Sequence, residues 1–256
     1  MTEITVEHDD GTGWVTIDHP GRKNSLTGEA CVEFADALVD LAHDDSVRCV
    51  VVTGANNAFC SGIDLAGGAG TDGAGDELEN GLNVIARQLL TMEKPTVASV
   101  SGPAVGAGAA IATACDFVYA SESATFGWGF TDIGLAPDTG ATYVLSRLVG
   151  YRTAMELLTT GRRLSATEAE DLDIVNAVVP DDDLTRTVDR HVETLSNRPT
   201  KAVGELKRLL VRNSHRSLEE ALAGEARVQK RMLQTDDFIE GVSAFLEDRQ
   251  PEFTGK

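Results

Sequence analysis

The stretch TVASVSGPAVGAGAAIATA, residues 96–114, joins a strand pattern to a helix pattern through a turn of small residues. Residues 96–100 form a short apolar run, which is typical of a strand covered on both faces. The glycines and alanines of residues 102–110 allow another backbone segment to come close. A helix is expected from about Gly108 to Ala114. The stretch therefore predicts one strand–turn–helix unit of an α/β fold.

The rest of the first half repeats this alternation of strand and helix patterns, which favours the same fold class. Residues 4–7 and 14–18 alternate with a period of two, and the turn-rich residues 9–13 between them predict a hairpin. The β-branched run at residues 47–53 predicts a core strand. Helices are expected over residues 27–41 and 77–92, short strands over 116–120, 124–126 and 174–179, and mostly helices from residue 140 onward, with a boundary at Pro199.

The charge balance excludes two classes of partner. Among 256 residues, 22 basic and 41 acidic side chains give 22 − 41 = −19 as the formal net charge. Nucleic acids and anionic membranes bind clustered cationic surface, so neither is expected as the main partner. We interpret the excess acid as a solvated surface suited to high salt, because salt screens the self-repulsion.

Length and composition favour one soluble globular domain. No apolar run approaches the roughly 20 residues that span a bilayer. The residues at the N-terminus lack the basic and apolar parts of a secretory signal, so the cytoplasm is the expected location. The four cysteines show no C-x-x-C spacing and the five histidines no H-E-x-x-H spacing. Neither a disulfide framework nor a metal site is therefore expected.

Two segments, residues 59–65 and 105–109, each lead from a strand pattern into a turn of small residues that opens a helix. Backbone amides at a helix start lack intrahelical acceptors and point outward. Two such turns brought together can hold a developing oxyanion. Taken singly, either turn is more simply explained as a connection between elements.

Six short segments carry a resemblance to a known family: NSL (24–26), VVVTG (50–54), AFCSGIDL (58–65), GAG (106–108), CD (115–116) and LSATEA (164–169). They occur in the order seen in the enoyl-CoA hydratase/isomerase, or crotonase, superfamily. The resemblance runs from about Glu3 to Phe253. It is closest to the phenylacetate-pathway 1,2-epoxyphenylacetyl-CoA isomerases and the dienoyl-CoA isomerases.

The resemblance implies a spiral of ββα units over residues 1–195. A helical C-terminal region, residues 196–256, is implied to mediate trimerisation, often as a dimer of trimers. The backbone amides of Ile63 and Ala107 are implied to bind the thioester carbonyl of an acyl-CoA as it becomes an enolate. Residues of the same turns are expected to line the substrate site: Ser61, Gly62, Asp64, Gly106 and Gly108. Coenzyme A is then part of the substrate, and no further cofactor is implied.

The carboxylates depart from the hydratase pattern. Family hydratases carry glutamates where this chain has Ala110 and Phe130, and neither residue can move a proton. The two isomerase branches use an aspartate at the position of Asp138. A double-bond shift needs only one base, and apolar neighbours such as Phe130 and Trp128 would raise the carboxyl pKa. From the residues alone, capping of the next helix is the favoured role of Asp138; with both family glutamates absent, we favour catalysis.

The remaining candidates have simpler explanations. Asp64 is expected to cap a helix after the first turn, and Asp116 to satisfy backbone groups at a strand start. Asp132 is a second-choice candidate for a catalytic carboxylate near the pocket. Ser61 and Cys60 are candidate nucleophiles, since a related protease branch uses a serine, but no histidine accompanies them, so packing is favoured.

Two basic side chains and one aromatic are candidates for holding CoA. Arg22 and Lys23 precede the NSL segment, where family members place contacts to nucleotide phosphates; a solvated turn is the alternative. Phe245 matches a segment that reaches a neighbouring subunit's CoA in trimeric relatives. The usual lysine of that segment is Asp248 here, and Arg249 is a candidate replacement. Residues 67–75 are expected to form a mobile loop that supplies part of the pocket.

We therefore predict an acyl-CoA isomerase that moves a carbon–carbon double bond in an unsaturated CoA thioester, ring-strained phenylacetate intermediates included. Asp138 is the acid/base, and Ile63 and Ala107 supply the oxyanion amides. Hydration of a 2-enoyl-CoA through other acid/base groups is the enzymatic alternative. A non-catalytic acyl-CoA-binding protein is the alternative from another class.

Overall fold

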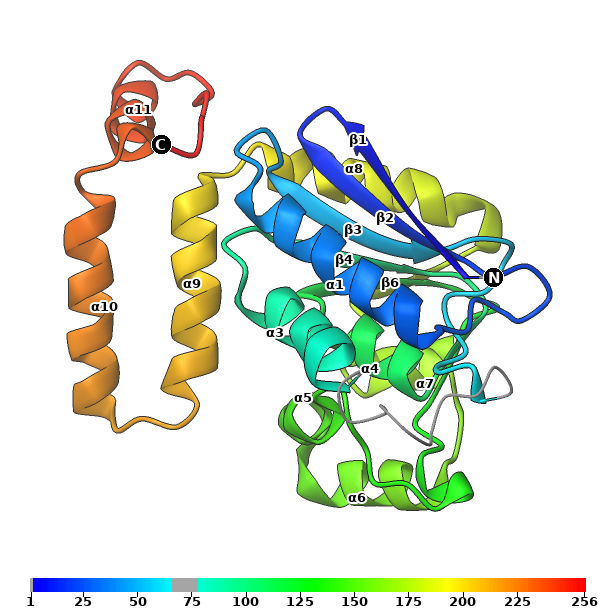
Figure 1. The fold of residues 1–256 in the computed structure, drawn as a ribbon. Helices are drawn as coiled ribbons and strands as arrows, with labels where there is room; N and C mark the ends of the chain where they lie inside the picture. Colours follow the sequence, from blue (N-terminus) through cyan, green and yellow to red (C-terminus); the bar gives the residue numbers. More distant parts are fainter. Residues whose placement is uncertain (1, 66–77) are drawn as a thin grey trace.

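A six-stranded sheet forms the centre of the molecule (Figure 1). The computed structural model describes residues 2–65 and 78–256. The strands are ordered β1-β2-β3-β4-β6-β9; the first two pair antiparallel and all other neighbours pair parallel. Their bounds are β1 (Glu3–Asp9), β2 (Thr12–Asp18), β3 (Cys49–Gly54), β4 (Thr96–Val100), β6 (Phe117–Ser121) and β9 (Ala177–Val179).

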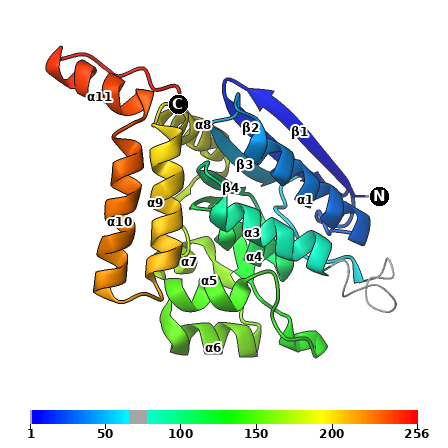
Figure 2. The ribbon, with the colours of Figure 1, turned by 60° about the vertical axis from the view of Figure 1, so that its left-hand side comes forward.

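Helices cover both faces of this sheet (Figures 1 and 2). The larger core lies under α1 (Gly28–His43), α3 (Asn83–Thr91) and α4 (Ala107–Ala114), and the smaller under α8 (Leu184–Ser196). Successive side chains of a strand point to opposite faces. Val50 and Val52 therefore join the larger core, whereas Val51 packs with Val188 of α8. The apolar run of β3 serves two cores, as its sequence predicts.

A second sheet of three short strands adjoins the start of α4. It consists of β5 (Pro103–Val105), β7 (Thr125–Gly127) and β8 (Leu164–Ser165). β5 pairs parallel with β7, which pairs antiparallel with β8. The sequence predicts β7 but not β5 or β8, because strands of three and two residues are too short to show an alternation.

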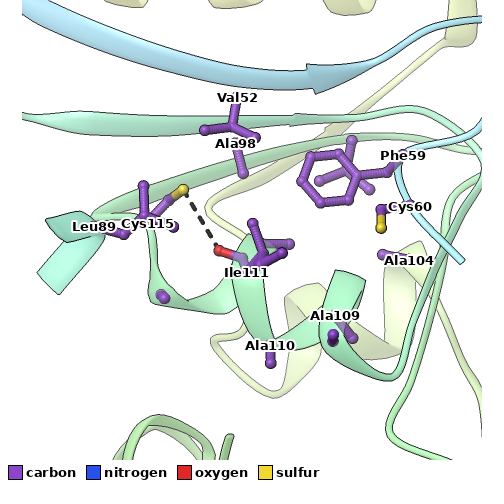
Figure 3. Packing of buried hydrophobic residues seen from close by; sticks show 14 of the residues in the cluster. Val52, Phe59, Cys60, Leu89, Ala98, Ala104, Ala109, Ala110, Ile111 and Cys115 are labelled. Atoms are coloured by element: carbon purple, nitrogen blue, oxygen red, sulfur yellow. Dashed lines mark hydrogen bonds between the residues drawn. The ribbon is translucent and has the colours of Figure 1, made fainter. Parts of the chain in front are cut away.

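Helix α4 is buried along its whole length and packs against the central sheet (Figure 3). Ile111 points toward Ala98 of β4, whereas Ala110 points away from the sheet (Figure 3). At the end of the helix the Cys115 thiol donates to the carbonyl of Ile111. Small side chains let this helix lie close to its neighbours on all sides.

The helix expected over residues 77–92 consists of a π-helical turn (Leu78–Leu82) and α3. The helix expected from residue 27 is α1, with the Thr27 hydroxyl accepting from the amide of Ala30 as its N-cap. Further helices and turns are η3 (Thr131–Ile133), α5 (Ala141–Leu148), α6 (Gly150–Thr160), α7 (Ala166–Asp171) and η4 (Asp181–Asp183). The mobile loop expected at residues 67–75 lies outside the described residues.

The C-terminal helices stand beside the core (Figures 1 and 2). α9 (Thr200–Asn213) and α10 (Leu218–Met232) form an antiparallel pair, and α11 (Asp236–Leu246) follows. The division of the chain at residue 195 stays a prediction. Across residues 2–65 and 78–256, no helix is both long enough and apolar enough to cross a bilayer.

An ion pair between a buried lysine and a partly exposed aspartate attaches α9 to the central sheet. Lys207 of α9 is 7% exposed, and its ammonium lies 2.7 Å from the carboxylate of Asp116, just before β6. The same carboxylate oxygen accepts from the amide and the hydroxyl of Thr96 in β4. Asp116 thus satisfies local backbone, as the sequence predicts, and also anchors the C-terminal region.

We expect Lys207→Met to lower the free energy of unfolding by about 1 to 2 kcal/mol, because Asp116 loses its charged partner while solvent at the partly exposed carboxylate screens part of the loss. Urea unfolding measures the change. The control is Arg186→Met, which removes an exposed pair with Asp183 and should cost less than about 1 kcal/mol. Equal losses in the two variants would contradict the anchoring role of Lys207.

Candidate active site

The first small-residue turn is held between two backbone segments. The amide of Leu26 donates to the carbonyl of Gly62, and the amide of Asp64 donates to the carbonyl of Leu26, both at 2.8 Å. These bonds use the carbonyl of Gly62 and the amide of Asp64, which flank Ile63. Within the described ranges, no acceptor takes the amide hydrogen of Ile63 itself. Asn24, 2% exposed, braces the preceding segment by donating to the carbonyl of Ala58.

The second turn joins β5 to α4. Gly106 has φ 57° and ψ −122°, and its amide donates to the carbonyl of Gly127 at 2.8 Å. Ala107 is the first residue of the helix, so its amide has no intrahelical acceptor. No acceptor elsewhere in residues 2–65 and 78–256 takes that hydrogen.

The two turns lie against each other, as the sequence predicts. The amide of Cys60 donates to the carbonyl of Pro103, and its carbonyl accepts from Val105 at 2.8 Å. A Cβ placed on Gly62 would lie 3.5 Å from the amide nitrogen of Ala107. A Cβ on Gly108 would clash with the carbonyl of Cys60, so only glycine permits this approach. The amides of Ile63 and Ala107 therefore belong to one constellation.

These turns form one wall of a cavity of about 190 Å³. Asp138 is its one ionisable lining residue among those described, and most of the other side chains are apolar. Phe130 lines the cavity, whereas Ala110 lies inside α4 and does not. The lining residues are Ser61, Gly62, Ile63, Leu65, Val105, Gly106, Ala107, Gly129, Phe130, Ile133, Leu135 and Asp138.

Asp138 is half-buried, and its side chain does not cap the helix that follows. Gly140 stands at the N-cap of α5 without a side-chain cap bond, while the backbone carbonyl of Asp138 accepts from the amide of Ala141. The Thr139 hydroxyl donates to Asp138 Oδ1 at 2.7 Å. Burial raises the pKa of Asp138 above its ordinary 3.8, opposed by that hydrogen bond. The capping explanation for Asp138 is therefore wrong for its side chain.

Three other predicted site residues take different places. Gly108 does not line the cavity; its role is the close approach described above. The Asp64 carboxylate lies 3.2 Å from the Arg22 guanidinium, and a helix for Asp64 to cap falls outside the described residues. Asp132 is exposed and absent from the cavity wall. None of the three brings a second acid or base to Asp138.

The loop that carries Arg22 and Lys23 backs the first turn. Ser61 Oγ donates to the carbonyl of Arg22, and the amide of Ser61 donates to the carbonyl of Lys23. Both basic side chains are exposed, with Arg22 paired to Asp64. Their contacts to CoA stay a prediction. The buried thiol of Cys60 has a pKa raised to about 12 by burial, which makes it a poor nucleophile.

Phe245 lies elsewhere in the chain. It is 84% exposed on α11 and lines a separate groove of about 510 Å³ with residues of α9 and α10. A single copy of the chain does not bring it to the cavity of Asp138. Arg249 is engaged by Glu240 and Glu247 on the same subunit. The described part of the chain holds no group of three or more potential metal-ligating side chains.

Sequence reasoning missed several lining residues. Gly129, Ile133 and Leu135 come from the irregular segment around η3, whose path no periodic pattern reveals. Thr139 is a further residue of the site that the sequence does not reveal, because its hydroxyl contacts the carboxylate of Asp138. A β-branched residue before glycine gives no sequence signal for that contact.

The model of the enoyl-CoA hydratase/isomerase family matches residues 7–256 of this chain. The chain is 35% identical to 1,2-epoxyphenylacetyl-CoA isomerase of Escherichia coli strain K12, with all of both chains covered. It is 32% identical to a Δ(3,5)-Δ(2,4)-dienoyl-CoA isomerase of Arabidopsis thaliana, over 93% of this chain and 90% of the relative. The crystal structure of an enoyl-CoA hydratase from Polaromonas sp. JS666 has a TM-score of 0.91 and 32% identity, covering 98% of this chain and 99% of that one.

We expect Asp138→Asn to stabilise the fold at neutral and higher pH. A carboxyl pKa raised by folding means that the ionised form is less favourable in the native state than in the unfolded chain. Above the folded pKa, Asp138 therefore lowers stability, and this penalty vanishes as the pH falls below the unfolded value near 3.8.

Thermal unfolding at several pH values checks this sign. The variant should melt higher than the parent at about pH 8 and equally near pH 3.5, below both pKa values. Asp132→Asn removes an exposed carboxylate nearby and serves as the control. A lower melting temperature for Asp138→Asn at pH 8 would refute the assignment of a desolvated carboxylate.

Proposed function

The chain belongs to the enoyl-CoA hydratase/isomerase family, and we propose that it is an isomerase that shifts a carbon–carbon double bond in an unsaturated acyl-CoA thioester. One observation carries the proposal: among the residues that the structure describes, two backbone amides without an acceptor and one half-buried carboxylate belong to residues that line the same cavity. This set of groups suits a proton transfer beside a stabilised enolate.

The amides of Ile63 and Ala107 would hold the thioester oxygen. Removal of a proton next to the conjugated carbonyl places negative charge on that oxygen, and fixed amides stabilise the charge without reorganising. Both are main-chain groups set by the pairing of Cys60 with Pro103 and Val105. Their geometry is therefore built into the fold before substrate arrives.

Asp138 would carry the proton from one carbon to another. The electron pair of the broken C–H bond enters the enolate, and the proton passes to the carboxylate. The same pair then forms a C–H bond at a different carbon, with the proton returned by the carboxylic acid. Atoms and charge balance without water, so one acid/base group suffices. The raised pKa of Asp138 makes both protonation states accessible nearer neutral pH.

Hydration is the second candidate, supported by relatives such as the enoyl-CoA hydratase from Polaromonas. Adding water needs a group that positions and activates it together with a group that protonates the neighbouring carbon. Positions 110 and 130 hold alanine and phenylalanine, and the described cavity wall offers no carboxylate besides Asp138. The same composition favours an apolar acyl group, since Phe130, Ile133 and Leu135 surround the carboxylate.

We also propose that the chain acts as a trimer. Large apolar side chains are exposed on the C-terminal helices, including Leu206 and Leu210 on one face of α9 and Phe245 on α11. A neighbouring copy would cover them, since a patch of this kind marks an interaction site. In such an assembly Phe245 would reach the CoA bound to the next subunit. Arg22 and Lys23 would contact the phosphates of the CoA bound to their own subunit.

Product analysis separates the functions. Purified protein in high salt is incubated with crotonyl-CoA and with a 3-enoyl-CoA, and products are followed by mass and ultraviolet absorbance. An isomerase converts the 3-enoyl-CoA without a change in mass, whereas a hydratase adds the mass of water to crotonyl-CoA. A protein that only binds yields neither product, which would overturn the proposal.

Asp138→Asn should lower isomerase turnover by about 10²–10⁴-fold, the usual contribution of a general acid/base. Asp132→Asn, outside the cavity wall, should keep near-parental turnover. Initial rates at saturating substrate give the comparison. Near-parental turnover in Asp138→Asn would remove this residue from the mechanism.

Light scattering in high salt tests the assembly. Three copies of a 27.2 kDa chain give about 82 kDa. The double variant Leu206→Glu with Leu210→Glu should dissociate, because it places charge on the apolar face. Arg212→Glu changes the net charge by the same two units on α9 and should remain assembled. A monomeric parent protein would contradict the proposal.

A further inference from the structure

We propose that Thr139 is a positioning residue for Asp138: its hydroxyl holds Oδ1 and leaves Oδ2 to take up and return the substrate proton. This inference rests on the proposed acid/base role of Asp138. It assigns different tasks to the two oxygens of one carboxylate, and it gives a purpose to a strained residue behind the cavity.

The contact itself is short and sheltered. Thr139 Oγ1 lies 2.7 Å from Asp138 Oδ1, and Thr139 is 1% exposed. Thr139 does not line the cavity, whereas Asp138 does. Within residues 2–65 and 78–256, no donor contacts Oδ2. The Thr139 hydroxyl thus holds one oxygen of a carboxylate whose residue lines the cavity.

The backbone at Thr139 is strained to make this contact. Its φ is 52°, in the left-handed region, where β-branched residues are genuine outliers. Gly140 follows at φ 76°, so the chain turns sharply between Asp138 and α5. Backbone strain of this kind occurs commonly at functional sites. Glycine at position 139 would avoid the strain but would leave Oδ1 without its donor.

A hydroxyl suits both halves of the proton cycle. It donates to Oδ1 while Asp138 is ionised, and it can keep that bond when Oδ2 carries the proton. Rotation of the carboxyl group is opposed in both states. Because Oδ1 is engaged in this way, we infer that the proton leaves from the oxygen that received it.

The ionisable groups on the surrounding elements do not explain the raised pKa of Asp138. They are Asp132 on η3, Glu79 on the π-helical turn, Arg87 on α3, Arg147 on α5, and Asp64 paired with Arg22 on the first oxyanion turn. Burial raises the pKa of Asp138, and the hydrogen bond from the Thr139 hydroxyl lowers it. The hydroxyl is therefore the contact to change.

The test compares Thr139→Val with Thr139→Ser. Valine is β-branched like threonine and must adopt the same left-handed backbone conformation, but it lacks the hydroxyl. Serine keeps the hydroxyl and lacks the methyl group. We expect Thr139→Val to lower kcat by about ten- to hundredfold, the loss typical of one hydrogen bond to a charged group, with KM little changed. The acidic limb of its kcat/KM profile should move to higher pH by about one unit. Thr139→Ser should restore the parental profile.

A substrate-free measurement separates this inference from the proposed function. The pKa of Asp138 is followed by carbon-13 NMR of labelled aspartate, with Asp138→Asn to assign the signal, and thermal unfolding is recorded for each variant. A higher pKa in Thr139→Val than in the parent and Thr139→Ser supports the inference, even if the parent shows no isomerase activity. An unchanged pKa and pH profile in Thr139→Val would overturn it. Equal losses of activity in both variants would also overturn it, since they indicate packing alone. Should Thr139→Val not fold, Thr139→Ala is measured against the same criteria.

Discussion

The backbone pairing between Cys60 and residues 103–105 fixes the distance between the two small-residue turns, and the site depends on that distance. Cys60 uses its amide toward Pro103 and its carbonyl toward Val105, so the first turn and the start of α4 cannot move independently. Gly108 permits the helix to reach that carbonyl. A side chain at this position would separate the amides of Ile63 and Ala107 and enlarge the space between them. The pair of amides that we propose to stabilise charge is therefore set by the fold, independent of any side-chain conformation.

The sequence predicts the parts of this arrangement that local patterns encode. The strand at residues 96–100 and the helix starting near residue 108 lie where expected, because apolar runs and small-residue turns are local signals. The resemblance to a known family places Ile63, Ala107 and Asp138 in one site, and the structure brings all three to one cavity. It does not anticipate the pairing of Arg22 with Asp64 or the contact of Thr139, since both depend on side-chain positions between neighbouring loops. The partner of Lys207 is likewise hidden, because 91 residues separate it from Asp116.

The features around Asp138 that suit the proposed chemistry also lower the stability of the fold. A desolvated carboxylate and a left-handed threonine both destabilise the native state, and both lie in the segment between η3 and α5. Elsewhere the chain follows ordinary rules: two capping boxes start α7 and α10, and β3 is covered on both faces. This distribution is typical of a site whose local cost is offset by the rest of the fold. The proposed isomerisation needs a base that is incompletely solvated, and Asp138 in this segment is a carboxylate of that kind.

The pairing of Arg22 with Asp64 has a consequence for how substrate arrives. CoA carries several negative phosphate charges, and the protein carries a formal charge of −19, so their first encounter is repulsive. The guanidinium beside the first turn is already neutralised by an aspartate and adds little attraction at long range. At 0.1 M salt, dissolved ions largely screen the repulsion between charges more than about 10 Å apart, and they weaken an exposed ion pair as well. The capture rate of an anionic thioester is therefore expected to increase with ionic strength, opposite to the trend for enzymes with cationic entrances.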